Sequence, residues 1–327
     1  MNRAWILRGV LFLFALGLMA CGPKSQESEA PHREEWIKEI PLYGDVAKVT
    51  VTLYRYLEEN GEYIKGSELQ TDIYEFNNEG NVTKHTLEFP RASAHHLKRE
   101  TYLIEYDGKG RKIGKYSNDD TCNIKYKYDD EGRLIEESFL HSNDDNKNGG
   151  CDTLPYFRRL YKYDSKGNLI EERGIDYIHF ENCDAWRCTY KYDTKGRKTE
   201  QYLYQAEYLD VHTIFEYKGN KCISQSSWDG NNKLFAKKSY KYDDNNRKIE
   251  ELTYDDNGEV DITRIYKYDS QGNIVEFTDR QDYVRGKLYG EIHKYKYDTK
   301  GNRIEDMVYW LDMTPKWATE YTIEYRE

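Results

Sequence analysis

The sequence predicts an all-β protein: an array of about ten two-stranded antiparallel repeats that form one long twisted or spiralling sheet. Two observations predict this class. A short phrase, in which a tyrosine pair precedes Asp-x-x-Gly and an apolar-acidic run, recurs along most of the chain. The chain also contains 32 tyrosines, while hydrophobic residues make up only 38% of it. That composition suits a half-solvated sheet better than a thick aliphatic core.

The repeated phrase supplies two strands and the turn between them. In residues 126–137 and again in 161–172, tyrosines alternate with charged residues at the period of a strand. The aspartate is a residue that begins type I turns, and the glycine supplies the positive φ that follows. The same frame returns at Tyr190/Tyr192/Asp193, Tyr240/Tyr242/Asp243, Tyr266/Tyr268/Asp269 and Tyr295/Tyr297/Asp298.

The spacing between repeats varies too much for the variation to lie inside the strands. We therefore place this variation in the second turn of each unit. Loops that differ between units often carry the functional residues of a protein. The long insertions are Pro90 to Lys98, Ser142 to Pro155, Tyr177 to Trp186 and Arg280 to Leu288.

The frame Tyr-x-Tyr-Asp-x-x-Gly-Arg/Asn-Leu/Ile resembles the YD repeats of the rearrangement-hotspot (RHS) family and of teneurins. The resemblance covers the chain from about Thr71 to the end. It implies a continuous antiparallel sheet, which in the large members of the family spirals into a hollow shell around a toxin. The alternative architecture is a β-propeller, in which two units would make one four-stranded blade.

The chain divides into four segments. Residues 1–20 are expected to be a lipoprotein signal peptide and residues 21–35 a flexible acidic tether. Residues 36–70 are expected to supply N-terminal capping strands, since Lys48 to Tyr56 alternates like a strand but lacks the Asp-x-x-Gly turn. Residues 71–327 form the repeat domain.

The run Leu18-Met19-Ala20-Cys21 resembles the lipobox of bacterial lipoproteins. The resemblance implies that Cys21 is acylated, with palmitate among the chains, and becomes the new N-terminus. The absence of an aspartate after Cys21 favours the outer membrane of a Gram-negative bacterium, at its surface or periplasmic face. The alternative is an ordinary cleaved signal with an incidental cysteine.

Composition and motifs argue against catalysis and against nucleic-acid binding. The formal net charge is -10, and an acidic surface repels phosphate backbones. No signature of a zinc protease, a serine hydrolase or a phosphate loop is present. Paired acids such as Glu136-Glu137 and Glu250-Glu251 would point to opposite faces of a strand, so we interpret them as charges that face the lysines of neighbouring Tyr-Lys-Tyr runs.

One loop and one cysteine pair are candidate special sites. Asp144, Asn146, Asn148 and Asp152 have the spacing of a calcium loop, although Pro155 stands where the bidentate glutamate belongs. The alternative is an ordinary polar turn, which would contain the same residues. No other cofactor is indicated by the sequence. Cys183 and Cys188 could close a short disulfide loop in an oxidising envelope. The alternative is that both are free thiols.

Five aromatic residues that do not recur from unit to unit are the candidate ligand contacts. They lie near loops and could meet a sugar ring or a protein partner, whereas the alternative is burial as local core. The residues are Trp186, Trp228, Tyr309, Trp310 and Trp317.

These features predict a non-catalytic, lipid-anchored envelope protein. Its expected role is binding or scaffolding towards a glycan or a surface protein, with the membrane reached through the lipid. The alternative is an immunity or protective protein that neutralises an incoming toxin.

Overall fold

The computed structural model describes residues 40–90, 98–118, 123–140, 155–178, 184–205, 207–281 and 287–327. The predicted signal peptide, the predicted tether and Cys21 lie outside these ranges. Within them, no helix is long and apolar enough to cross a membrane.

Twenty strands make up the regular structure of the described residues. In chain order they are β1 (Val46–Glu59), β2 (Glu62–Phe76), β3 (Val82–Phe89), β4 (Lys98–Tyr106), β5 (Lys112–Ser117), β6 (Asn123–Tyr128), β7 (Leu134–Leu140), β8 (Pro155–Tyr163), β9 (Leu169–Asp176), β10 (Asp184–Tyr192), β11 (Lys198–Gln205), β12 (Tyr208–Lys218), β13 (Lys221–Asp229), β14 (Leu234–Tyr242), β15 (Lys248–Tyr254), β16 (Val260–Tyr268), β17 (Ile274–Gln281), β18 (Lys287–Tyr297), β19 (Arg303–Trp310) and β20 (Pro315–Tyr325).

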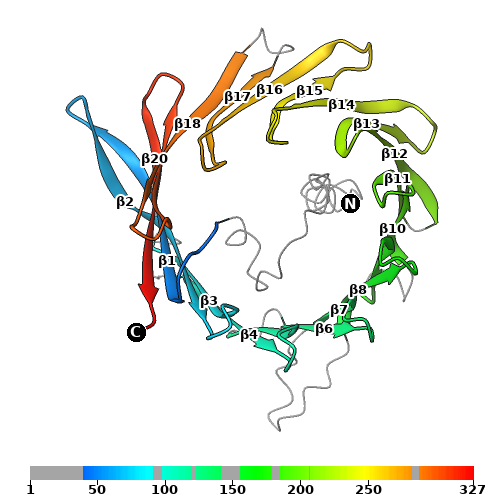
Figure 1. The fold of residues 1–327 in the computed structure, drawn as a ribbon, viewed down its shortest axis with the longest axis horizontal. Coiled ribbons are helices and arrows are strands. Elements are labelled where there is room, and N and C mark those ends of the chain that lie inside the picture. The colour runs from blue at the N-terminus through cyan, green and yellow to red at the C-terminus, as the bar shows by residue number, and fades with distance from the viewer. Residues whose placement is uncertain are drawn as a thin grey trace.

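The strands form one sheet that closes on itself. Each strand pairs antiparallel with the next, and β1 also pairs with β20 from Val46↔Tyr325 to Arg55↔Trp317. The elements therefore follow one another around a ring (Figure 1). The predicted all-β repeat sheet is confirmed, and the propeller alternative is wrong because a single sheet, not separate blades, contains every strand. A sheet this wide curls because the twist of successive strands accumulates.

The two faces of the ring differ in chemistry. The middle lysine of each Tyr-Lys-Tyr run lies on the outer face; the side chains of Lys127 and Lys241 are 61% and 67% exposed. Five of the six lysines pair with a glutamate directly across on the next strand, as predicted: Lys127–Glu136, Lys191–Glu200, Lys241–Glu250, Lys267–Glu276 and Lys296–Glu305.

The second acid of each pair points to the inner face and is not a solvated charge, contrary to the expectation from sequence. Glu251 is only 5% exposed and is bridged by Lys238, Lys248 and Arg264. Burial alone would raise the pKa of the Glu251 carboxyl, but the hydrogen bond from Lys248 and the nearby lysine charges outweigh it and lower the pKa to about 2.

The Asp-x-x-Gly turns form as predicted. At Asp164, the carboxylate Oδ1 accepts the backbone N–H groups of Lys166 at 2.9 Å and Asn168 at 2.8 Å. Gly167 has a φ of 82° and donates its N–H to the Asp164 carbonyl. The Asn168 side-chain hydrogen bond, together with these backbone donors, lowers the pKa of Asp164. The aspartate is thus occupied by the turn.

The second tyrosine of each pair joins neighbouring repeats. In seven units its hydroxyl donates to a backbone carbonyl at the register shift that follows the preceding turn, where a β-bulge interrupts the ladder. The pairs are Tyr106 to Val82, Tyr128 to Lys112, Tyr163 to Leu134, Tyr192 to Leu169, Tyr217 to Lys198, Tyr242 to Cys222 and Tyr268 to Lys248, at 2.6 to 2.8 Å. The Tyr297 hydroxyl instead accepts from Asn273, and the Tyr325 hydroxyl donates to Asp298.

The residue after the turn glycine strengthens this link where it is arginine. Arg133 donates to Asp129 at 2.7 Å, and its guanidinium lies 5.0 Å from the ring centroid of Tyr163 in the following unit. Turn, arginine and next tyrosine therefore contact one another in the units that carry this arginine.

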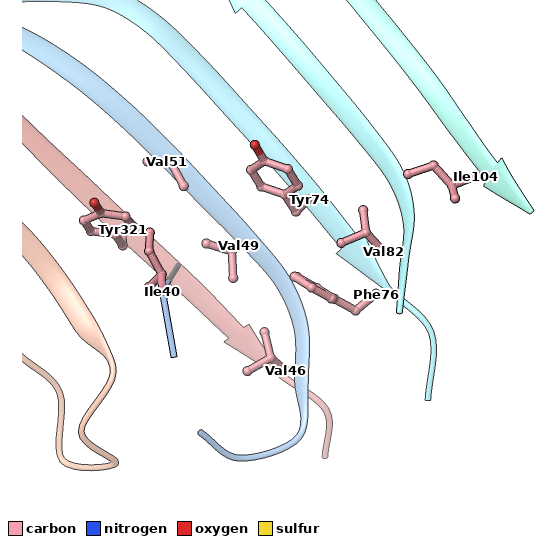
Figure 2. Packing of buried hydrophobic residues seen from close by; sticks show 9 residues of the cluster. All are labelled: Ile40, Val46, Val49, Val51, Tyr74, Phe76, Val82, Ile104 and Tyr321. Atoms are coloured by element: carbon pink, nitrogen blue, oxygen red, sulfur yellow. The ribbon is translucent and has the colours of Figure 1, made fainter. Parts of the chain in front are cut away.

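The main apolar core lies where the chain begins and ends in the ring. Figure 2 shows its residues packed over β20, β1, β2, β3 and β4, and they are Ile40, Val46, Val49, Val51, Tyr74, Phe76, Val82, Ile104 and Tyr321. Residues 40–45, here called the lead-in segment, run along the inner side of the ring before β1 (Figure 1).

Asn302 fastens the lead-in segment to the last repeats. Its side chain is fully shielded from solvent. It accepts the N–H of Tyr43 at 2.5 Å and donates to the Tyr43 carbonyl at 2.9 Å and to the Tyr325 hydroxyl at 2.6 Å. Arg326 also pairs with Asp45. With these contacts and a partner on each of its edges, β1 closes the array.

Candidate functional site

The ring has two chemically different rims. Because consecutive strands run antiparallel, every Asp-x-x-Gly turn that follows a tyrosine pair lies at one rim, which we call the turn rim. The opposite rim, the variable rim, carries the β1–β2 and β19–β20 connections and the segments that follow β3, β7, β9 and β17. The four insertions identified in the sequence all fall at the variable rim.

Most loop residues at the variable rim lie outside the described residues. These include the predicted calcium positions Asp144, Asn146, Asn148 and Asp152. Among the described residues, no group of three His, Cys, Asp or Glu side chains is placed to hold a metal ion.

Cys183 also lies outside the described residues, whereas Cys188 is on β10. The Cys188 thiol is free and buried. Burial raises its pKa to about 12, and the charge of Glu172 adds to the effect. A thiol with so high a pKa is a poor nucleophile and a poor metal ligand at neutral pH.

Trp186 is core and not a surface contact, which corrects the prediction for this residue. It is 7% exposed on β10. Gly174 on the neighbouring strand leaves the room that the indole fills, since a Cβ at Gly174 would overlap Trp186 and Phe157. Only the strand pairing brings these residues together.

Trp228 belongs to a small cluster on the outer face. It is half-buried and lies 5.8 Å from the ring of His212, which stacks on Tyr202 at 4.3 Å. Glu200 accepts from both His212 and Tyr202. The ring faces are thus partly covered by neighbours on the same sheet.

Trp310 and Trp317 meet at the variable rim, but Tyr309 does not join them. Val308 lies opposite Trp317, so Trp310 shares the inner face with it, while Tyr309 points outwards and lies beneath Lys294. The Nζ of Lys316 lies 3.8 Å from the ring centroid of each tryptophan. This places a cation between two indole rings.

Charged partners hold Lys316 in place. Its ammonium pairs with Glu291, which lies opposite Trp310 on β18. His293 approaches the same carboxylate at 3.7 Å and Asp306 at 3.1 Å. Lys316 and Glu291 therefore form an ion pair with each other. The Trp310 side chain remains 41% exposed.

Further exposed apolar side chains lie at the variable rim near Trp310, on both faces of the sheet. We call this group the aromatic rim and define it by residues of β18, the β19–β20 turn and the β1–β2 hairpin. They are Leu288, Tyr289, Trp310, Met313, Leu57, Tyr63 and Ile64, each 37% to 55% exposed.

The β1–β2 part of the aromatic rim is a ribbon that extends beyond its neighbours. The pairing of β1 with β20 ends at Arg55, and the pairing of β2 with β3 starts at Thr71. Figure 1 shows this hairpin projecting away from the ring. Its tip carries Glu58, Glu59 and Glu62, all exposed and with no cation within 4.0 Å among the described residues.

This ribbon was not among the features predicted from the sequence. Asn60-Gly61, with φ values of 55° and 81°, forms the tight two-residue turn that this dipeptide favours. That dipeptide between two alternating runs was the available signal.

Comparison with known proteins gives only weak likenesses. No protein-family model matches the chain, and no curated protein matches it. Among solved structures it is similar to the Photorhabdus luminescens Tc holotoxin pore, at 13% identity over 85% of this chain and 16% of that chain, with a TM-score of 0.34. TcdB2-TccC3 without its hypervariable C-terminal region matches at 13% identity over 83% of this chain and 16% of that chain, with a TM-score of 0.32.

The chain thus spans only 16% of the length of each toxin chain. Those toxin chains carry repeats of the RHS or YD type. A porin-like protein from Bacteroides uniformis is similar at 12% identity over 86% of this chain and 99% of that chain, with a TM-score of 0.34. Scores this low say nothing about function.

Proposed function

We propose that this protein is a non-catalytic binding protein of the bacterial envelope, whose aromatic rim docks another envelope protein. The observation that carries the proposal is a group of exposed apolar side chains at the variable rim on successive neighbouring strands, from β18 through β20 to β1 and β2. Contiguous exposed apolar surface marks interaction sites on soluble proteins. Tryptophan and tyrosine are also the residues that most often dominate binding energy at protein interfaces.

The partner is a protein and not a glycan, for two reasons. A sugar platform needs an open ring face with free polar groups beside it, but Lys316 covers Trp310 and Trp317 and is itself paired with Glu291. The rest of the rim is partly aliphatic, with Leu57 and Leu288 exposed. Aliphatic side chains suit a protein surface better than a sugar ring.

The charge at the ribbon tip narrows the partner further. Glu58, Glu59 and Glu62 have no described cation beside them, so a partner with lysine or arginine opposite them would gain complementary charge. The partner surface should therefore combine an apolar centre with a basic edge.

Lipidation of Cys21 would hold the ring at the outer membrane, and the lipobox-like run supports this part of the proposal. A lipid-held chain meets its partner in two dimensions, which raises the effective concentration of both.

The test is affinity for a partner identified by cross-linking from the rim. Trp310→Ala should raise the dissociation constant at least tenfold, because an aromatic side chain at the centre of an interface contributes about 2 kcal/mol or more to binding. The matched control is Trp228→Ala, which removes a half-buried tryptophan from the outer face and should change the affinity less than threefold.

Two outcomes would contradict the proposal. Equal affinities for the Trp310→Ala and wild-type proteins would remove the rim from the interface. Binding of the wild type to a glycan array, lost in Trp310→Ala, would make the ligand a sugar instead of a protein.

A further inference from the structure

A polar pocket lies at the turn rim, on the side of the ring away from the aromatic rim. Its volume is about 330 Å³. The walls come from two successive turn units, through Gln271, Asn273 and Lys300, and from Pro41 and Tyr43 of the lead-in segment. A pocket of this size is at the lower end of the range for small-molecule sites.

Two cations line the pocket without a carboxylate partner. Neither Lys300 nor Arg303 has a carboxylate oxygen within 4.0 Å among the described residues. The Lys300 ammonium instead lies over the ring of Tyr325, 3.4 Å from its centroid. Lys294, which lies over the Tyr309 ring, also lacks a carboxylate within 4.0 Å among the described residues, so what distinguishes Lys300 is its place in the pocket wall.

Neighbouring groups fix the position of the Arg303 guanidinium but do not use all of its N–H donors. Its guanidinium lies 4.1 Å from the ring centroid of Tyr295 and donates from Nη2 to the Asn273 side-chain oxygen at 2.7 Å. Its Nε is shielded from solvent and makes no hydrogen bond. Because Arg303 lines the pocket, a ligand there would meet guanidinium N–H groups other than the shielded Nε.

The nearest acids do not compete for these cations. The Asp298 carboxylate accepts backbone N–H groups from its own turn and the Tyr325 hydroxyl. Asp269 is occupied in the same way by its own turn and by Asn273. Both carboxylates have a lowered pKa, so each is satisfied as an anion within its turn.

The pocket exists at one place because the lead-in segment supplies one of its walls. Asn302 fixes Tyr43 there through two hydrogen bonds to its backbone. The unit at Asp193-Thr194-Lys195-Gly196 has the same turn sequence as Asp298-Thr299-Lys300-Gly301. It has no lead-in segment beside it, so Lys195 provides a matched comparison.

We propose that this pocket binds a small oxyanion, a carboxylate or a phosphate group. Lysine supplies a point charge and arginine a planar fork, the combination that recognises both groups. The site is independent of the aromatic rim, since it lies at the other end of the strands and shares no residue with it.

The test is anion binding by the full-length protein, measured by isothermal titration calorimetry with inorganic phosphate and, separately, with acetate. Sodium chloride at equal ionic strength provides the baseline. Lys300→Gln should weaken binding about tenfold or more, because it removes a charge-assisted contact. Lys195→Gln should leave the dissociation constant within twofold. Arg303→Lys keeps the charge but loses the fork and should also weaken binding about tenfold.

The ligand class follows from which anion responds. Binding of phosphate alone or acetate alone identifies the group, and binding of both supports the shared chemistry. Equal weakening by Lys300→Gln and Lys195→Gln, or no saturable binding of either anion at millimolar concentration, would overturn the proposal. If Arg303→Lys disturbs the fold, as circular dichroism would show, the two lysine variants decide the matter alone.

Discussion

Replacing Asn302 with alanine should loosen the closure of the ring. The Asn302 side chain is fully shielded from solvent and joins the lead-in segment to the last repeat. Alanine would remove three hydrogen bonds, two to the Tyr43 backbone and one to the Tyr325 hydroxyl, together with a longer contact of 3.3 Å to Asp298. The turn itself keeps its shape, because its backbone hydrogen bonds to Asp298 do not involve the lost amide.

The magnitude follows from these three contacts. A neutral hydrogen bond contributes about 0.5 to 1.5 kcal/mol net, so the loss should be about 3 kcal/mol. The entropy of unfolding is about 2.1 cal/mol/K per residue, or about 0.6 kcal/mol/K for about 290 residues. Dividing one by the other predicts a fall in melting temperature of about 5 °C.

The assay is thermal unfolding followed by circular dichroism, with Asn168→Ala as the matched control. Asn168 occupies the same position of another turn, but its amide reaches only Asp164, at 2.9 Å. Its removal should cost about 1 kcal/mol and lower the melting temperature by less than 2 °C. Equal shifts for the two variants would refute the idea that Asn302 fastens the ring.

Three further predictions concern a turn, a buried acid and the lipid. Gly167→Val should destabilise the folded protein by about 1 to 3 kcal/mol, because a β-branched residue is strained at a φ of 82°. The control Lys166→Val should change the midpoint of urea unfolding little. Similar midpoints for the two variants would contradict the predicted turn. Glu251 has a folded pKa of about 2 and a higher unfolded one, so its contribution, of the order of 2 to 3 kcal/mol, is present above about pH 4.5 and lost as the pH falls towards 2. Glu251→Gln should therefore lose less stability than the wild type between pH 5 and pH 3 in urea unfolding, and parallel losses would show that this carboxyl is not responsible. Cys21→Ala should abolish labelling by a palmitate analogue and release the protein from the membrane fraction; persistent labelling would place the lipid elsewhere.

Local features of the ring could be predicted from the sequence because each is encoded within one phrase. The turn at Asp164 needs only the spacing of aspartate and glycine, and the outer pair Lys127–Glu136 needs only strand alternation. The burial of Glu251 could have been anticipated by the same alternation, since its neighbour Glu250 faces outwards. The local pattern of residues therefore predicts the strands, the turns and the face to which most side chains point.

Features that depend on distant pairing could not be predicted in this way. Trp186 is buried because Gly174 lies beside it on the adjacent strand, and the register that joins them follows an insertion. Closure of β1 on β20 depends on twist accumulated over the whole array, which no single repeat encodes. The pocket beside Lys300 depends on this closure, because the lead-in segment forms one wall.

The most direct test of the account is site-specific photo-crosslinking in living cells, with a photoreactive amino acid at one rim or the other. Met313 is 43% exposed at the aromatic rim, and Lys195 is exposed in a turn at the opposite rim. The probe at Met313 should capture a discrete envelope protein, and Trp310→Ala should abolish this product. The probe at Lys195 should capture none. Equal capture from both rims, or no product from Met313, would contradict the claim that the aromatic rim is the binding surface.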